Sequence, residues 1–203
     1  IVCPPILESL INSCPYVDDV IARDDVVTTF NSYANLLSLP KILGTTLETI
    51  PATTPYLFAD QAKRNVWREK LAGTNKFKVA FAWQGRPTHS IDIERSLPLE
   101  AFIPLTELEH LQCYSIKCVD GREQLDKFRH KDRIIDLAES IESSEDPFAE
   151  HAAIMKEVDL VISCDSALAH LAGALDVNVW TLLPYASDWR WFQDRTDSPW
   201  YSS

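Results

Sequence analysis

The sequence predicts an α/β fold in which helices cover both faces of an open parallel β-sheet. From Phe77 onward, apolar segments of strand length alternate with segments of helical periodicity. The apolar segments are nearly continuous, which is typical of strands that are buried on both faces. The chain has 203 residues, of which 46% are hydrophobic and 24% are charged, a composition that suits a globular protein with a substantial core. These observations indicate a Rossmann-like layout.

The part of the chain before Phe77 is less regular. It is rich in Pro, Thr and short apolar runs. A longer helix is expected after Asp60, a residue type that caps helix N-termini, and is expected to end at Gly73, a typical C-terminal cap. The shorter elements predicted here are a helix over Ile6–Leu10 and strands over Asp18–Ala22 and Leu36–Leu39.

The regular part of the chain alternates between strands and helices. The predicted strands span Phe77–Trp83, Gln112–Lys117, Arg133–Leu137, Asp159–Cys164 and Val177–Leu183. The predicted helices span Pro98–Leu108, Arg122–Phe128, Phe148–Val158 and Ser166–Leu175. Proline is favoured in the first turn of a helix, as at Pro98.

Charge and cysteine usage exclude several classes of protein. With 30 acidic and 19 basic side chains the formal net charge is −11, which argues against nucleic-acid binding. No apolar run approaches the roughly 20 residues of a membrane span, so no transmembrane segment is expected. Five cysteines stand at spacings that suit neither zinc nor a disulfide framework. Free thiols and the lack of a signal peptide indicate a cytoplasmic protein.

The strongest candidate site follows the strand Asp159–Cys164. Asp165 stands between this strand and the next helix, where it can serve as N-cap while the free N–H groups of the first turn attract phosphate. Helical spacing places Ser166 and His170 on the side opposite the leucine stripe. The alternative is structural: Asp165 is only a cap, and His170 is a packed, hydrogen-bonded core residue.

A second candidate is the long loop that follows Trp83. It contains His89, Arg95 and Ser96 shortly before a helix. Arg95 and Ser96 suit a diphosphate, because a guanidinium offers paired donors in a fixed geometry. The alternative is a solvated loop whose charges pair with one another.

Two further segments give weaker signals. Lys117 lies at the end of a predicted strand, where it could touch a ribose or a base, or simply be structural. The segment 184–201 is dense in aromatic residues, which could form a pocket wall, a stacking platform or part of the core.

Several motifs together resemble a known family. They are DLVIS-x-D-S-x-x-AHLAGAL from Asp159, VW-x-LLP, DWRW and D-x-x-DSPWY toward Tyr201, and W-x-G-x-P-x-H followed by RSLPL after Trp83. These motifs, with the segment 36–57, resemble the heptosyltransferase-like domain of glycosyltransferase family 9, as found fused to tetratricopeptide repeats in bacterial proteins. The resemblance covers nearly the whole chain and implies a GT-B fold, which has two Rossmann-like domains with a cleft between them.

The resemblance also implies a domain organisation. Residues 1–58 would be a remnant of the N-terminal, acceptor-side domain, and residues 59–73 a linker helix. Residues 74–203 would form the C-terminal, donor-binding domain. The chain is therefore expected to be a fragment, with the rest of the N-terminal domain, the repeats and a final crossing helix outside this sequence.

By resemblance the activity is transfer of a sugar from a nucleotide-diphosphate sugar to a hydroxyl of an unknown glycan or protein acceptor. Asp165 and Ser166 would contact the diphosphate or sugar, Arg95 the phosphates, and His170 would support that site. Neither a metal ion nor another cofactor is implied. The general base in relatives lies in the N-terminal domain, and His89 is the only candidate within this chain, so the fragment is expected to be inactive alone.

Two departures from the family leave other functions open. Ile93 stands where relatives often have a second arginine, and Lys117 where they usually have glutamine. One alternative is a non-catalytic module that binds nucleotide sugars or other proteins on the same fold. Another is a nucleotide-sugar epimerase or hydrolase, such as a UDP-N-acetylglucosamine 2-epimerase. Fold alone does not choose among these, and the base, sugar and acceptor are not determined.

Overall fold

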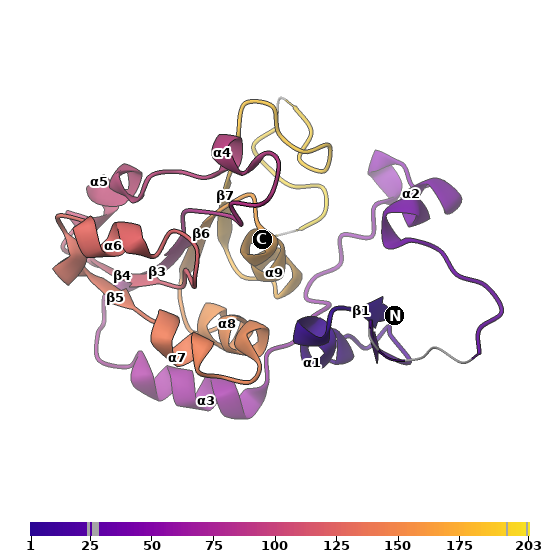
Figure 1. The fold of residues 1–203 in the computed structure, drawn as a ribbon, viewed down its shortest axis with the longest axis horizontal. Coiled ribbons are helices and arrows are strands. Elements are labelled where there is room, and N and C mark those ends of the chain that lie inside the picture. The colour runs from indigo at the N-terminus through magenta and orange to yellow at the C-terminus, as the bar shows by residue number, and fades with distance from the viewer. Residues whose placement is uncertain (24, 26–28, 194, 202) are drawn as a thin grey trace.

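The structure, a computed structural model, describes residues 1–23, 25, 29–193, 195–201 and 203 (Figure 1). Its main body is built on the strands β3 (Phe77–Ala82), β4 (Leu111–Ser115), β5 (Ile134–Asp136), β6 (Leu160–Cys164) and β7 (Val179–Leu182). Within the described residues they form one five-stranded sheet in the order β5-β4-β3-β6-β7. Every pairing is parallel. The predicted α/β class is therefore confirmed.

Helices cover the sheet on both faces, and Figure 1 shows the two groups on opposite sides of the strands. One face packs against α3 (Gln61–Lys70), α7 (Ala138–Glu142), α8 (Pro147–Met155) and α9 (Ala167–Ala174). The other packs against a 3₁₀ turn (Leu99–Phe102), α5 (Ile103–Thr106), α6 (Glu123–Lys127) and the following 3₁₀ turn (Lys131–Arg133).

The central strand β3 shows why the sequence is apolar from Val79 to Ala82. Val79 and Phe81 point into the core under α5 and α6. Ala80 and Ala82 point into the core under α8 and α9. Because alternate side chains of a strand face opposite sides, a strand covered on both faces favours apolar residues at successive positions.

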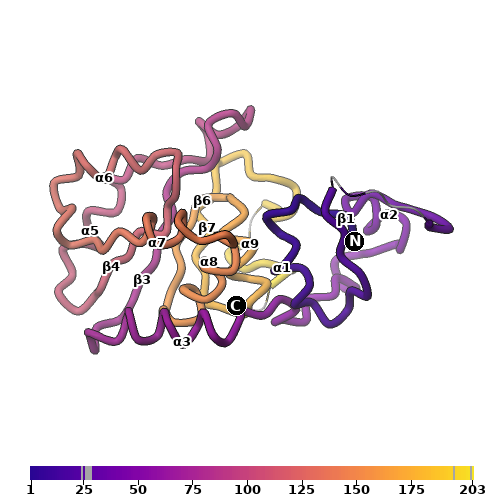
Figure 2. Tube along the Cα trace, turned by 60° about the horizontal axis from the view of Figure 1, so that its bottom comes forward, coloured from indigo at the N-terminus to yellow at the C-terminus, as the bar shows by residue number. Residues whose placement is uncertain are grey.

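The first part of the chain lies beside this main body, as Figure 2 shows. Strand β1 (Val2–Cys3) pairs in parallel with β2 (Ile21–Ala22), and α1 (Glu8–Asn12) follows a 3₁₀ turn over Pro5–Leu7. Further along lie α2 (Leu39–Ile42) and two 3₁₀ turns (Leu36–Ser38 and Leu47–Thr49). The predicted domain boundaries remain predictions.

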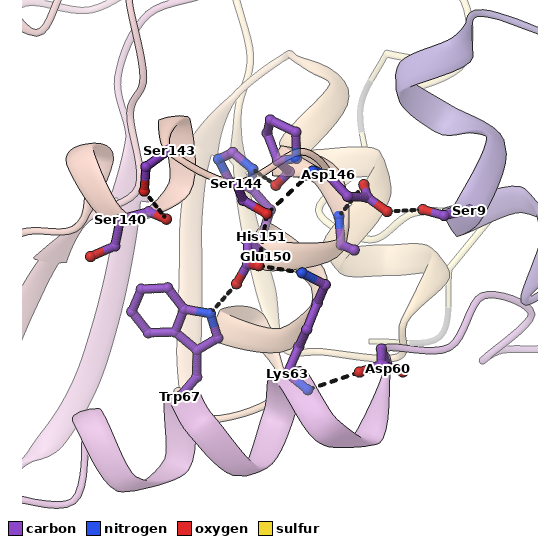
Figure 3. A network of polar contacts seen from close by, with 12 residues as sticks. Ser9, Asp60, Lys63, Trp67, Ser140, Ser143, Ser144, Asp146, Glu150 and His151 are labelled. Atoms are coloured by element: carbon purple, nitrogen blue, oxygen red, sulfur yellow. Dashed lines mark hydrogen bonds and ion pairs between the residues drawn. The ribbon is translucent and has the colours of Figure 1, made fainter.

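A polar network holds α3 and α1 against α8 (Figure 3). Lys63 of α3 forms an ion pair with Glu150 of α8. The indole Nε1 of Trp67 donates to Glu150 at 2.6 Å. Ser9 of α1 donates to Asp146, the N-cap of α8. Helices α3 and α1 are thereby both anchored on α8.

Several predicted elements were wrong in detail. Leu36–Leu39 is not a strand: it forms a 3₁₀ turn that runs into α2, where Pro40 occupies the first turn, a position proline tolerates. The predicted helix Pro98–Leu108 is split, because Pro104 has no backbone N–H with which to continue the helical hydrogen bonds. The predicted C-cap Gly73 lies beyond α3, which ends at Lys70.

Candidate functional site

The best-formed candidate site lies where the strand order reverses. The chain runs from β3 outward through β4 to β5, then returns to β6 on the other side of β3 and continues to β7. The loops that follow β3 and β6 therefore diverge, and in open α/β sheets ligands bind in the crevice between such loops. A pocket of about 470 Å³ lies here, lined by Leu36, Leu37, Pro40, His89, Ile91, Arg95, Asp165, Ser166, Ala167, His170, Asp188, Trp189, Arg190, Trp200 and Tyr201.

Arg95 joins the two loops at the floor of this pocket. It is the last residue of α4 (Asp92–Arg95), a single helical turn within the loop after β3. Its Nε donates to Asp92 Oδ1 at 3.2 Å, and its Nη1 donates to the backbone carbonyl of Asp165 at 2.9 Å. The side chain of Arg95 is 13% exposed, so its position is set by these partners. Because a guanidinium has five N–H donors, the remaining ones are available to a ligand.

Gly85 is the residue that makes room for this arrangement. A Cβ at this position would overlap the Asp92 carboxylate and lie 2.5 Å from Arg95 Nη2. The backbone N–H of Gly85 donates to Ser96 Oγ at 3.0 Å, which closes the loop. Ser96 therefore shapes the loop and is not among the residues that line the pocket.

The start of α9 forms the wall next to Arg95. Ser166, in extended conformation, caps the helix by accepting a hydrogen bond from the Leu168 N–H at 3.3 Å. The prediction that Asp165 is the N-cap was wrong, because the chain stays extended one residue longer than expected. The Asp165 carboxylate instead lies 3.8 Å from His170 Nε2, and its side chain is buried.

His170 is fixed by contacts on several sides. Its ring stacks on Trp191 with centroids 5.1 Å apart, and its Nδ1 lies 2.9 Å from the hydroxyl of Tyr201. Burial holds the pKa of His170 below its ordinary value; the charge of Arg190 acts in the same direction, while Asp165 and Asp188 oppose it. The imidazole is therefore neutral at pH 7.

This lowered pKa predicts a pH dependence of stability. A histidine that resists protonation in the folded state contributes stability above its ordinary pKa of about 6.5, and that stability is lost as pH falls below it. In urea titrations at pH 8 and pH 5.5, we expect the free energy of unfolding of His170→Gln to depend less on pH than that of the wild type. The exposed control His110→Gln should follow the wild type, and equal pH dependence in both variants would contradict the expectation.

The aromatic C-terminal segment supplies a second guanidinium. Arg190 Nη1 donates to Asp188 Oδ1 at 2.6 Å, and the guanidinium lies over the ring of Trp189, 4.8 Å from its centroid. Trp200 donates from Nε1 to the backbone carbonyl of Arg190 at 2.8 Å. The segment lines the pocket and also contributes Trp191 to the buried core, so two of the interpretations left open apply to different residues. Sequence reasoning did not single out Arg190, although a basic residue between two tryptophans was a usable signal.

The third wall comes from the first part of the chain. Leu36 and Leu37 reach the pocket from the 3₁₀ turn before α2, although both side chains remain largely exposed. Sequence reasoning assigned a strand here and did not expect these residues at the site.

The remaining candidates lie at or beyond the edge of the pocket. His89 is exposed and lines its rim. Lys117 is buried, does not line the pocket, and donates from Nζ to the carbonyl of Cys118 at 2.8 Å. Burial lowers the pKa of Lys117. The structure therefore brings together His89, Arg95, Asp165, Ser166 and His170, and leaves Ser96 and Lys117 out of the pocket.

The described residues contain no group of three or more His, Cys, Asp or Glu side chains arranged to hold a metal ion. That the reaction needs no metal stays a prediction. The five cysteines are free thiols, and burial raises the pKa of Cys113, Cys118 and Cys164 to about 11. In the part of the chain that the structure describes, no helix has the length and apolarity needed to traverse a lipid bilayer.

Comparison with known proteins gives two similarities. Residues 128–192, less than half of the chain, match the family model of glycosyltransferase family 9 (heptosyltransferase). No curated protein matches the chain. Among solved structures, ADP-heptose lps heptosyltransferase II of E. coli is similar with 14% identity and a TM-score of 0.49, over 68% of this chain and 42% of that one. The chain thus spans well under two thirds of that enzyme's length.

The family match supports the predicted resemblance in its C-terminal part. The matched segment contains Asp165, Ser166, His170 and Arg190, whereas Arg95 and His89 lie outside it. The expected fusion to tetratricopeptide repeats is not tested by these similarities and stays a prediction.

Proposed function

We propose that this chain supplies the donor-binding half of a glycosyltransferase that uses a nucleotide-diphosphate sugar. The family match of residues 128–192 supports the class of reaction. The observation that carries the proposal is the hydrogen bond from Arg95 Nη1 to the Asp165 carbonyl, 2.9 Å long. It places a cation beside the start of α9, so two features that attract phosphate converge on one pocket.

The chemistry follows from where negative charge develops. An acceptor hydroxyl attacks the anomeric carbon, the bond from that carbon to the diphosphate oxygen breaks, and the nucleoside diphosphate leaves with added negative charge. Arg95 and the N-terminus of α9 are placed to stabilise this charge, with Arg190 as a second cation in the pocket lining. Ser166 would donate to a phosphate oxygen, and the Asp165 carboxylate would accept a hydrogen bond from a sugar hydroxyl.

The acceptor would enter from the side of the pocket that carries Leu36 and Leu37. A general base must take the proton of the acceptor hydroxyl. His89 at the rim is the candidate within this chain, and a group in a longer polypeptide is the alternative. The two-domain GT-B organisation, with residues 1–58 on the acceptor side and 74–203 on the donor side, belongs to this proposal. So do the cytoplasmic location and the tetratricopeptide repeats in the same polypeptide.

The proposal predicts binding of one nucleoside diphosphate that depends on Arg95. Calorimetric titration with UDP, GDP, ADP and CMP should show one preferred nucleotide. Arg95→Ala should weaken its binding about 10- to 150-fold, the effect of losing a charge-assisted hydrogen bond worth roughly 1.5–3 kcal/mol. The matched control is Arg129→Ala. It removes an exposed arginine that pairs with Glu107, and neither residue lines the pocket.

Three outcomes would count against the proposal. Equal losses for Arg95→Ala and Arg129→Ala would remove Arg95 from the site. If no nucleotide binds to the wild type, the titration is repeated on the longer natural polypeptide, and failure there would favour a non-catalytic module. Release of free nucleotide without an acceptor would instead favour a nucleotide-sugar epimerase or hydrolase.

A further inference from the structure

His170 connects the pocket to two segments that are distant in sequence. On one side its Nε2 faces the Asp165 carboxylate at 3.8 Å, and on the other its Nδ1 lies 2.9 Å from the Tyr201 hydroxyl. The indole of Trp191 covers one ring face, with an angle of 16° between the two planes. Because both nitrogens and one ring face have defined neighbours, these neighbours set the orientation of the imidazole.

Tyr201 is itself held in place. Its ring occupies the space beside Gly173, where a Cβ would overlap the ring. Tyr56 is a neighbour of Tyr201, and the backbone N–H groups of Tyr56 and Leu57 both donate to the Ala174 carbonyl at the end of α9, at 3.0 and 3.2 Å. Burial raises the pKa of both tyrosines, so each keeps its hydroxyl proton at neutral pH.

We propose that Tyr201 acts as a positioning residue for the pocket, by fixing which nitrogen of His170 carries the proton. Tyr201 donates its hydroxyl proton to Nδ1 across the 2.9 Å that separates them. The neutral imidazole then carries its hydrogen on Nε2, directed toward Asp165. The N–H edge of the imidazole thereby faces the Asp165 carboxylate, 3.8 Å away, and this carboxylate is the group that accepts a hydrogen bond from the ligand.

The role assigned to Asp165 here rests on the proposed function, whereas the hydrogen bond between Tyr201 and His170 rests on the geometry alone. The titratable and charged groups that face the imidazole are Asp165 beyond β6, Asp188 and Arg190 in the C-terminal segment, and Tyr201. A donor at Nδ1 stabilises the neutral ring, because protonation at that nitrogen would require the hydroxyl to turn around. Loss of the donor should therefore raise the pH at which half of His170 is protonated. It should also let the neutral ring carry its hydrogen on either nitrogen.

The test is long-range ¹H–¹⁵N NMR of the full chain labelled at histidine, titrated from pH 8 to pH 5. The His170 signals are assigned by their loss in His170→Gln. In the wild type we expect the Nε2–H tautomer. In Tyr201→Phe we expect a mixture of tautomers and a higher midpoint. The matched control Tyr185→Phe removes the same hydroxyl from a fully exposed side chain and should leave His170 unchanged.

An Nδ1–H tautomer in the wild type, or an unchanged His170 spectrum in Tyr201→Phe, would overturn the proposal. The tautomer of the wild type is measured without that variant, which keeps the proposal falsifiable if Tyr201→Phe does not fold. These measurements need no ligand, so their failure is distinct from failure of the proposed function.

A second measurement addresses the role in binding. UDP-glucose, GDP-glucose and ADP-glucose are titrated beside their parent diphosphates into the wild type and Tyr201→Phe. Because Asp165 would hold the sugar, Tyr201→Phe should weaken the preferred sugar nucleotide about 2- to 10-fold, the net value of one hydrogen bond, and leave its diphosphate unchanged. Equal weakening of both, or of neither, would overturn the positioning role.

Discussion

Gly85→Ala is expected to remove most of the affinity for a nucleoside diphosphate while leaving the chain folded. The added methyl group would overlap Asp92 Oδ1 and would lie 2.8 Å from the Cζ of Arg95. The guanidinium must move away, and it then loses its hydrogen bonds to Asp92 and to the Asp165 carbonyl. Calorimetric titration should show a loss similar to that of Arg95→Ala, about 10- to 150-fold.

The same substitution should lower the free energy of unfolding by about 1–3 kcal/mol, since Asp92 is buried and loses its partner. Gly73→Ala is the matched control: Gly73 has open space around its Cβ position and lies on a turn beyond α3. It should leave the affinity unchanged. If Gly85→Ala bound the nucleotide as the wild type does, the fixed position of Arg95 would not matter for binding.

Phe81→Ala should have the largest effect on stability, about 3–5 kcal/mol in the free energy of unfolding. Phe81 is completely buried on β3, stacks on Phe102 with centroids 4.9 Å apart, and lies 6.3 Å from Trp83. Its removal leaves a cavity beneath the strand end that carries the loop with Arg95. Urea titration, with extrapolation to zero denaturant, measures the loss.

Phe77→Ala offers a control on the same strand. Phe77 stands at the start of β3, on the same side of the strand as Phe81, and is 46% exposed. Its loss should cost less than about 1 kcal/mol, because much of the side chain is already in water. Similar losses for the two variants would mean that the core under α5 and α6 does not carry the stability of the sheet.

Sequence reasoning found the two loops of the pocket for a physical reason. Asp165 and Arg95 each stand in a polar segment directly after a continuous apolar strand. The carboxyl ends of parallel strands meet at one edge of the sheet, so polar residues after two such strands converge there. Lys117 follows a strand by the same logic, yet its strand β4 lies away from the point of reversal, and its side chain turns back into the protein.

Sequence reasoning failed where the outcome depended on a partner far along the chain. Arg95 and the Asp165 carbonyl are 70 positions apart, and His170 and Tyr201 are 31 apart. Neither pairing has a local signal. The cap of α9 was placed one residue early, because aspartate and serine are similarly good N-caps and only the extended conformation of Ser166 decides between them.

The sequence by itself determined the strand and helix alternation, the two-sided burial of the sheet and the chemical character of the loops, since these follow from local periodicity and residue type. Only the tertiary structure decided which of those loops share a pocket, that Arg190 and the leucines before α2 complete it, and that Tyr201 reaches His170. The strand order, in which β6 returns to the far side of β3, brings these residues together. That order is set by how helices on both faces bury the sheet, a property of the whole chain that no short segment contains.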